Sequence, residues 1–156
     1  MERIAHTFRQ VAERVSIAPV KDLIKQPGMR NVHRVTVHYH DFRASDAVAT
    51  LTQRLSEPAR LEVIYEGHFD HKPLTRQFSA TDFERFCQVF LNIRFDKMID
   101  QQGVSPFGVD VCMVERASGG FERSIIFAPS KADGYYATVY NAVSAYIPEV
   151  VREVKS

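Results

Sequence analysis

The sequence lacks the short motifs that identify the common enzyme chemistries. Its 156 residues contain no nucleophile elbow, no phosphate-binding glycine loop, no cysteine set with metal-ligand spacing and no dinucleotide fingerprint. These absences favour a function other than catalysis. We therefore expect no catalytic residue, no cofactor and no bound metal.

Cysteine is scarce, and long apolar segments are missing. Cys87 and Cys112 fall on apolar faces of predicted elements, so we expect buried free thiols, although a disulfide between them is also compatible with the sequence. No apolar run approaches the roughly 18 residues that span a bilayer. The first 15 residues carry charges along their whole length, which is unlike a secretory signal. We therefore expect a cytoplasmic protein without membrane contact.

Neither sign of charge dominates the chain. There are 20 basic and 19 acidic residues, and the two signs alternate along most segments. Proteins that bind nucleic acids or anionic membranes usually carry an excess of positive charge on the binding surface. The near balance argues against both. It leaves another protein, or a second copy of this chain, as the expected partner.

Hydrophobic residues make up 45% of the chain, and 156 residues suffice for one domain with its own core. Apolar residues at helical spacing predict an amphipathic first helix, and a short second helix over residues 17–25 ends at Pro27-Gly28. The apolar positions of the first helix are Ile4, Phe8, Val11, Ala12 and Val15. We divide the chain into a helical arm, residues 1–28, and an α+β domain, residues 29–156.

The pattern then changes from period two to a helical period. Residues 31–42 predict a half-buried strand whose odd-numbered side chains turn inward, and residues 44–55 predict a helix capped by Ser45. The apolar residues are Val35, Val37 and Tyr39 in the strand, and Val48, Leu51 and Leu55 in the helix. A helix at this place would form a crossover between parallel strands.

The rest of the chain predicts two hairpins and two helices. The hairpins consist of strands 61–69 and 74–78 and of strands 109–116 and 121–128. The first helix has a Thr81-x-x-Glu84 capping box and the core stripe Phe83, Phe86, Cys87, Phe90 and Leu91. The second helix runs from Tyr136 to Val154 and breaks at Pro148. The whole predicts one α+β domain with about five strands in a mixed or mostly antiparallel sheet, as in a ferredoxin-like βαββαβ variant. Helices pack on one face, with amphipathic helices at both termini. A simple antiparallel sheet is the alternative if residues 44–55 form a loop or a strand.

Histidines and glutamates gather on the predicted outer face of the sheet. We choose His38, His40, Glu66 and His68 as candidate ligand-binding residues, because two imidazoles two residues apart on a strand share a face. The alternative is an ordinary polar outer face. His33 has the parity of the apolar face, and we interpret it as a residue at a strand end.

The terminal helices supply a candidate partner surface, which consists of Phe8, Val11, Tyr135 and Tyr146. Three functions follow from the sequence. We favour a non-catalytic interaction or assembly module that forms a homodimer. The second is a small-molecule or metal-binding domain centred on the histidine cluster. The third, an enzyme with histidine acid–base chemistry, has no identifiable residue to orient the imidazole.

Overall fold

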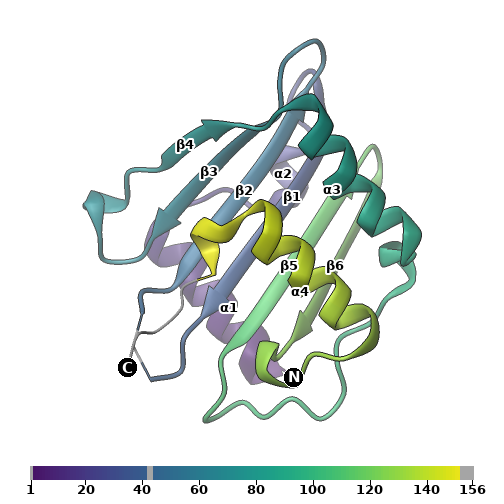
Figure 1. Ribbon diagram of the computed structural model, residues 1–156. Helices are drawn as coiled ribbons and strands as arrows, with labels where there is room; N and C mark the ends of the chain where they lie inside the picture. Colours follow the sequence, from purple (N-terminus) through teal and green to yellow (C-terminus); the bar gives the residue numbers. More distant parts are fainter. Residues whose placement is uncertain (1, 42–43, 152–156) are drawn as a thin grey trace.

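The computed structural model describes residues 2–41 and 44–151. Within these residues the chain is one α+β domain built on a six-stranded antiparallel sheet (Figure 1). The strands are β1 (Met29–His38), β2 (Ala47–Arg54), β3 (Arg60–Tyr65), β4 (Leu74–Gln77), β5 (Val111–Ser118) and β6 (Phe121–Phe127). The α-helices are α1 (Glu2–Val15), α2 (Val20–Leu23), α3 (Ala80–Asn92) and α4 (Gly134–Tyr146). Short 3-10 turns are η1 (Phe69–His71), η2 (Phe95–Lys97), η3 (Pro129–Lys131) and η4 (Pro148–Val150).

The strand order is β4-β3-β2-β1-β5-β6, and every neighbouring pair is antiparallel. Successive hairpins lay down β1 to β4 toward one edge of the sheet. The chain then passes through α3 to the other side of β1, where β5 and β6 complete the sheet (Figure 1). The strand β1 is therefore central, and the residues at its two ends can meet side chains from several other elements.

The predicted helix over residues 44–55 is wrong, because this segment contains β2. Ala47, Ala49 and Leu51 face one side of the sheet, and the β-branched residues between them face the other, which is the period-two pattern of a strand buried on both faces. The helical spacing of Val48, Leu51 and Leu55 is incidental. The sheet accordingly has six strands with no parallel pair, so the ferredoxin-like arrangement is wrong and the antiparallel alternative describes it.

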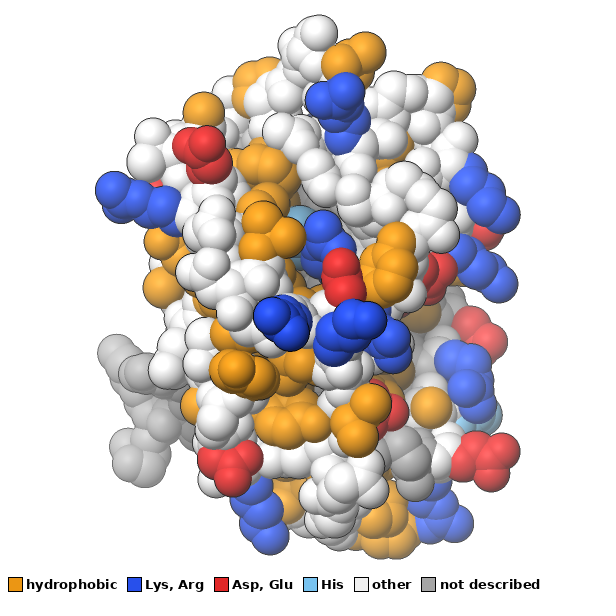
Figure 2. Space-filling view, turned by 90° about the vertical axis from the view of Figure 1, so that its right-hand side faces the viewer, with side chains coloured by type: hydrophobic (Ala, Val, Ile, Leu, Met, Phe, Trp, Pro, Cys, Tyr) orange, Lys and Arg blue, Asp and Glu red, His pale blue; other side chains and the backbone are white. Residues whose placement is uncertain are grey.

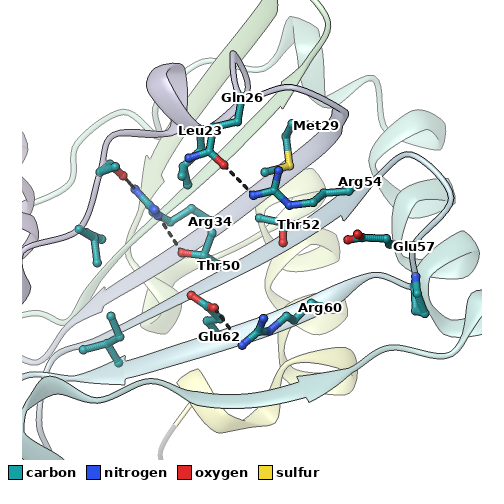
Figure 3. Close-up of a pocket in the computed structure, with 14 residues that line it drawn as sticks. Leu23, Gln26, Met29, Arg34, Thr50, Thr52, Arg54, Glu57, Arg60 and Glu62 are labelled. Atoms are coloured by element: carbon teal, nitrogen blue, oxygen red, sulfur yellow. Dashed lines mark hydrogen bonds and ion pairs between the residues drawn. The ribbon is translucent and has the colours of Figure 1, made fainter.

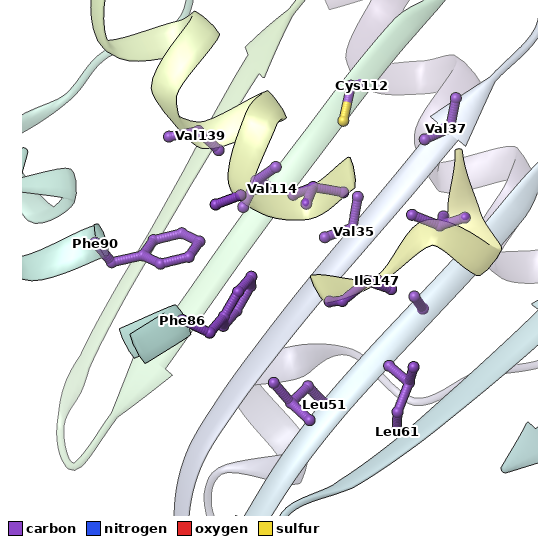
Figure 4. Close-up of a cluster of buried hydrophobic side chains, with 14 of the residues drawn as sticks. Val35, Val37, Leu51, Leu61, Phe86, Phe90, Cys112, Val114, Val139 and Ile147 are labelled. Carbon is purple, nitrogen blue, oxygen red and sulfur yellow. The ribbon is translucent and has the colours of Figure 1, made fainter. Parts of the chain in front are cut away.

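One face of the sheet packs against α3 and α4 and forms the main hydrophobic core (Figure 4). Phe86 and Phe90 of α3 and Val139 of α4 point toward the sheet in this view. The predicted inward residues of the first strand are all buried here, namely Val35 and Val37 of β1 and Tyr39 directly after it. His33 is buried on the same face, because β1 begins four residues earlier than His33, and the interpretation of this histidine as a strand-end residue is wrong.

The other face of the sheet is covered in part by α1 and α2, which lie behind the sheet in Figure 1. The sequence predicts helices on one face and does not decide where the N-terminal helix lies, and the structure places α1 and α2 on the second face. The side chains of α1 that pack on this face fall into two clusters, Ile4 and Phe8 with Val111 and Ile126, and Val11 and Val15 with Val48 and Ile64. The physical reason is that this face carries an apolar row across the strands, which an uncovered face would expose to water.

Several element ends differ from the predicted ones. The helix α3 begins after Ser79, whose hydroxyl accepts a hydrogen bond from the Asp82 backbone N–H at 3.0 Å, rather than at the predicted capping box. Leu91, expected in the core stripe of α3, is exposed. The strand β3 ends before Gly67, which has a φ of 75°, so Phe69 lies in the η1 turn and is exposed instead of facing the core.

The last helix ends at Tyr146 and is followed by the η4 turn at Pro148, in agreement with the predicted break. Residue 42, the predicted end of the first strand, and Val154, the predicted end of the last helix, lie outside the described residues. In the part of the chain that the structure describes, no helix combines the length and the apolar character needed to cross a membrane.

Candidate ligand site at the end of the central strand

A histidine–aspartate pair stands at the end of β1. The β1–β2 hairpin pairs Val37 with Ala47, which brings His38 beside Asp46 at the start of β2. His38 Nδ1 lies 2.7 Å from Asp46 Oδ2, and Asp46 Oδ1 accepts a hydrogen bond from the Tyr39 backbone N–H at 3.0 Å. Both carboxylate oxygens are thus engaged. The orientation of the imidazole is set by a side chain that is itself held by the backbone.

The helix α1 extends this pair into a chain of alternating charges. Arg14 forms an ion pair with Glu66 and lies 3.8 Å from Asp46 Oδ2. Glu66 follows β3, and its backbone N–H donates to the Asp46 carbonyl oxygen at 2.9 Å. Helix α1 and the ends of β1, β2 and β3 therefore converge on one cluster, whose members are His38, Asp46, Arg14 and Glu66. We call it the His38 cluster.

The hydrogen bond with Asp46 raises the pKa of His38, while partial burial and the positive charge of Arg14 act in the opposite direction. The imidazole therefore holds its proton to a higher pH than a free histidine. In the protonated form both ring nitrogens are donors, so Nδ1–H donates to Asp46 and Nε2–H is available to a further acceptor. With His38 protonated, the formal charges of the cluster, two positive and two negative, cancel.

A hollow of about 580 Å³ adjoins the His38 cluster. All four cluster residues line it, and so do Thr7, Gln10, Ala44, Ser45 and Gly67. Within the described residues, neither the Ser45 hydroxyl nor the Gln10 amide forms a hydrogen bond with another side chain. Together with His38 Nε2 they give the hollow three hydrogen-bonding groups that are not consumed by the fold.

His40 does not join His38 but forms a separate pair. Its Nδ1 lies 2.7 Å from Asp110 Oδ1, which also accepts the His40 backbone N–H at 3.1 Å. The two imidazoles thus engage different carboxylates, and His40 lines a smaller hollow of about 180 Å³ with His38 at its border. His40, Asp41 and Asp110 offer three metal-type ligand atoms within 4.8 Å of one another among the described residues. Both aspartates have further interactions within the fold, so this exposed group gives no basis for a metal site.

The remaining predicted site residues lie elsewhere. His68 is in the turn after β3, beside Phe69, and it does not line the hollow, whereas Glu66 does. In the predicted partner surface, Phe8 and Val11 are buried against the chain's own sheet. Tyr146 is half-buried with its ring edge-on to Phe86, and Tyr135 is exposed.

A second hollow, of about 280 Å³, lies on the same face of the sheet under α2 (Figure 3). Its deepest charged group is the buried Arg34, whose Nε donates to Thr50 Oγ1 at 3.0 Å and whose Nη1 donates to the Ala18 carbonyl oxygen at 2.7 Å. Arg54 reaches Gln26 at 2.6 Å and Arg60 pairs with Glu62 at 3.5 Å, as the dashed lines in Figure 3 show. The arginines of this hollow are bonded within the protein, as the cations of the His38 cluster are, and its volume is about 280 Å³ against about 580 Å³, so it is the weaker candidate for a ligand site.

Asp46 and Arg14 are functional candidates that sequence reasoning missed. Asp46 was assigned to a helix, where its position next to His38 is not apparent, and Arg14 belonged to a helix considered only for its apolar side. A strand at residues 47–54 would have made residues 39–46 a hairpin connection. Under that assignment His38 and Asp46 are expected to be neighbours, so the signal was present in the alternation of β2.

The comparisons with known proteins give no further guide. No protein-family model matches this chain, and no curated protein matches it either. We therefore infer the function of this chain from the geometry of the site.

Proposed function

We propose that this chain is a ligand-binding domain that holds a small, polar and uncharged molecule in the hollow beside the His38 cluster. The observation that carries the proposal is the convergence of α1, β1, β2 and β3 on His38 and Asp46, next to three hydrogen-bonding groups that the fold leaves unused. Hollows of a few hundred Å³ with a few convergent polar groups are typical ligand sites. The proposal corresponds to the second of the three functions that the sequence suggested.

The balance of charge indicates the class of ligand. His38 and Arg14 are each matched by a carboxylate within the cluster. A charged ligand would be attracted by the side chains of one sign and repelled about equally by those of the other. Hydroxyl and amide groups suit the available donors and acceptors, namely His38 Nε2, the Ser45 hydroxyl and the Gln10 amide. A small polyol or an amide-bearing metabolite therefore fits the hollow best.

Binding is favoured over catalysis by one feature of the same site. The orienting carboxylate that an acid–base enzyme requires is present in Asp46, but no activated nucleophile lies beside His38 among the described residues. Ser45 lines the hollow but forms no hydrogen bond with His38, so the contact that activates a nucleophilic serine is not made among the described residues.

The test is a titration of the full chain with myo-inositol, glucose, glycerol and glycinamide, followed by the NMR signals of the His38 ring nitrogens and the Ser45 amide. At least one compound is expected to shift both sets of signals in a saturable way. A His38→Gln substitution should weaken that binding about 10-fold or more, because it removes a charge-assisted hydrogen bond worth about 1.5–3 kcal/mol.

His40→Ala is the matched control, since His40 forms its own pair with Asp110 outside this hollow. It should leave the titration unchanged and alter the free energy of unfolding by less than about 0.5 kcal/mol, as expected for an exposed side chain. If all four compounds leave His38 and Ser45 unshifted, or if His38→Gln binds as well as the original chain, the proposal fails.

A second candidate function is the interaction module that the sequence favoured, and a specific observation supports it. Tyr135 of the predicted partner surface is 59% exposed, and Ile99, which lines the same groove, is 61% exposed. The right-hand side of the molecule in Figure 1 is seen face-on in Figure 2, where hydrophobic side chains lie among basic and acidic ones. Aromatic side chains are enriched at protein interfaces, so the exposed ring of Tyr135 beside exposed Ile99 favours this candidate.

We infer self-association as the function of this groove, with light scattering as its test. A dimer at micromolar concentration that is lost in a Tyr135→Glu, Ile99→Glu variant would support the assignment. A monomer at all concentrations would disprove self-association through this groove. It would not affect the proposal of a ligand site beside the His38 cluster, which lies on the other side of the sheet.

A further inference from the structure

A cleft of about 810 Å³ lies between α3 and the sheet, on the opposite face from the His38 cluster. Figure 1 shows α3 crossing the sheet near the start of β1 and the end of β5. The helix contributes Phe83, Cys87 and Leu91 to the cleft, and the sheet contributes Asn31, Gln53 and Arg116. The cleft thus has an aromatic and aliphatic wall opposite a polar floor.

The strand register places His33 at the inner end of this floor. Asn31 lines the cleft and pairs with Gln53, and His33 is the next side chain of β1 on the same face. Directly across the strands, His33 pairs with Arg116, which also lines the cleft. Phe83 lines the cleft as well, and its ring centroid lies 6.4 Å from that of His33, so it is a cleft residue whose ring lies beside the imidazole.

The imidazole of His33 is fully buried, and neither of its ring nitrogens has a hydrogen-bond partner in the described structure. Each unsatisfied buried polar group costs on the order of 1–3 kcal/mol. The groups around it cannot meet this need, because the nearest rings are those of Phe86 and Phe90, with centroids at 5.2 and 5.1 Å. A buried polar group without a partner calls for an explanation, and an unfilled ligand contact is one.

The surroundings also fix the chemistry that His33 can offer. Burial, with a smaller effect of the positive charge on Arg116, lowers the pKa of His33 to about 3, so the ring is neutral at physiological pH. A neutral imidazole has one N–H donor and one acceptor nitrogen. Arg116 itself is held by Asp96, with Nη1 at 2.8 and 2.9 Å from the two carboxylate oxygens.

We propose that the cleft beneath α3 binds a flat, mainly apolar molecule that carries one hydroxyl or carbonyl group, that the ring of Phe83 turns aside as this molecule enters, and that His33 then forms the hydrogen bond to its polar group. The aromatic wall favours a flat ring, since ring edges and faces pack well against phenylalanine. The ligand needs only one polar group, because Asn31 and Gln53 of the floor already bond to each other and Arg116 is held by Asp96. This site is independent of the ligand hollow beside His38, which lies on the other face of the sheet.

Phenol and toluene are suitable probes, because they have nearly the same shape and differ only in the hydroxyl group. We would titrate each into the full chain and follow the NMR signals of the Phe83, Cys87 and His33 side chains. Both compounds should shift the signals of Phe83 and Cys87, and phenol should bind about 3- to 10-fold more tightly, which is the ratio that one net hydrogen bond provides. Only phenol should shift the ring nitrogens of His33.

A His33→Leu variant should abolish the preference for phenol while retaining the binding of toluene. The matched control is His68→Leu, which exchanges an exposed histidine in the η1 region and should keep the preference. If His33→Leu does not fold, Cys87→Phe provides the second test, because the larger side chain fills the cleft and should prevent the binding of both probes. Failure of phenol to shift the cleft signals, or a preference for phenol that persists without His33, would overturn the proposal.

Discussion

The two faces of the sheet are built from the same strands but are organised differently. The face under α3 and α4 carries one continuous hydrophobic cluster that draws side chains from all six strands or their ends and from both helices. The face under α1 and α2 carries three small clusters instead. Between them lie rows of charged and hydroxyl-bearing residues, among them Arg34, Thr50 and the His38 cluster.

The two faces therefore have different roles: the face under α3 and α4 stabilises the fold, and the face under α1 and α2 positions polar groups. The row of Glu62, Thr50, Arg34 and Glu115 crosses four strands in register. Burial raises the pKa of Glu115 and lowers that of Arg34, so these charges are held in a poorly solvated layer. Charged groups in such a layer lose hydration and contribute little net stability, so we expect the free energy of folding to come mainly from the continuous core on the other face.

The strongest test of this division is Phe86→Ala. The Phe86 side chain is fully buried and contacts Phe78, Phe90 and Tyr146 in the large cluster. Its removal should lower the free energy of unfolding by about 3–5 kcal/mol, measured by urea denaturation at neutral pH. A loss below about 1 kcal/mol would show that the large cluster is not the main source of stability.

Phe8→Ala makes the matched change on the other face, because Phe8 is 2% exposed in a cluster that contains only three other fully buried residues. We expect a loss near the low end of the range for phenylalanine, about 3 kcal/mol, because α1 can shift on the sheet and fill part of the cavity. Hydrogen exchange of the α1 amides should increase before that of β1. If both variants lose the same free energy of unfolding and their α1 and β1 amides exchange at the same rate, the two faces do not differ in their contribution to stability. Such a result would show that α1 and the sheet unfold as one unit.

The sequence predicts the periodic parts of this fold and fails where two patterns overlap. The alternation in β1 and the stripe of α3 identify strand and helix because each has one apolar face. The first part of β2 is buried on both faces, so Ala47, Val48 and Ala49 are apolar in succession, and Val48 and Leu51 match a helix as well as a strand. The same error affects the candidate site. The residue types of His38 and Glu66 and their places on the outer face of their strands identify them from sequence. Asp46 and Arg14 reach them only through the β1–β2 hairpin and the docking of α1, which local residue spacing does not predict.

His33, which is buried in the large core, should make the stability of the fold depend on pH. Its folded-state pKa of about 3 lies below the value of about 6.5 in an unfolded chain, so the unfolded state takes up a proton first as the pH falls. The contribution of neutral His33 is complete above pH 6.5, and stability decreases below it by about 1.4 kcal/mol per pH unit until the folded-state pKa is reached. Urea denaturation between pH 7 and 5 should therefore show a loss of roughly 2 kcal/mol that is absent in His33→Leu. The control His68→Leu should retain this loss, and an equal pH dependence in His33→Leu would refute the assignment.

His38 should respond to pH in the opposite direction, and by a smaller amount. Its side chain is 22% exposed and its pKa is raised, mainly by the hydrogen bond to Asp46, so the protonated form is the one that the fold favours. The resulting stabilisation is fully present below the unfolded pKa of about 6.5 and disappears as the pH rises through the higher folded-state pKa. His38→Gln keeps an N–H donor for Asp46 but does not titrate, so the difference in unfolding free energy between the original chain and this variant should decrease from pH 6 to pH 9. A difference that stays constant over this interval would mean that the contact with Asp46 does not favour protonated His38. The four charges of the His38 cluster would then not balance, and the inference of an uncharged ligand would fail.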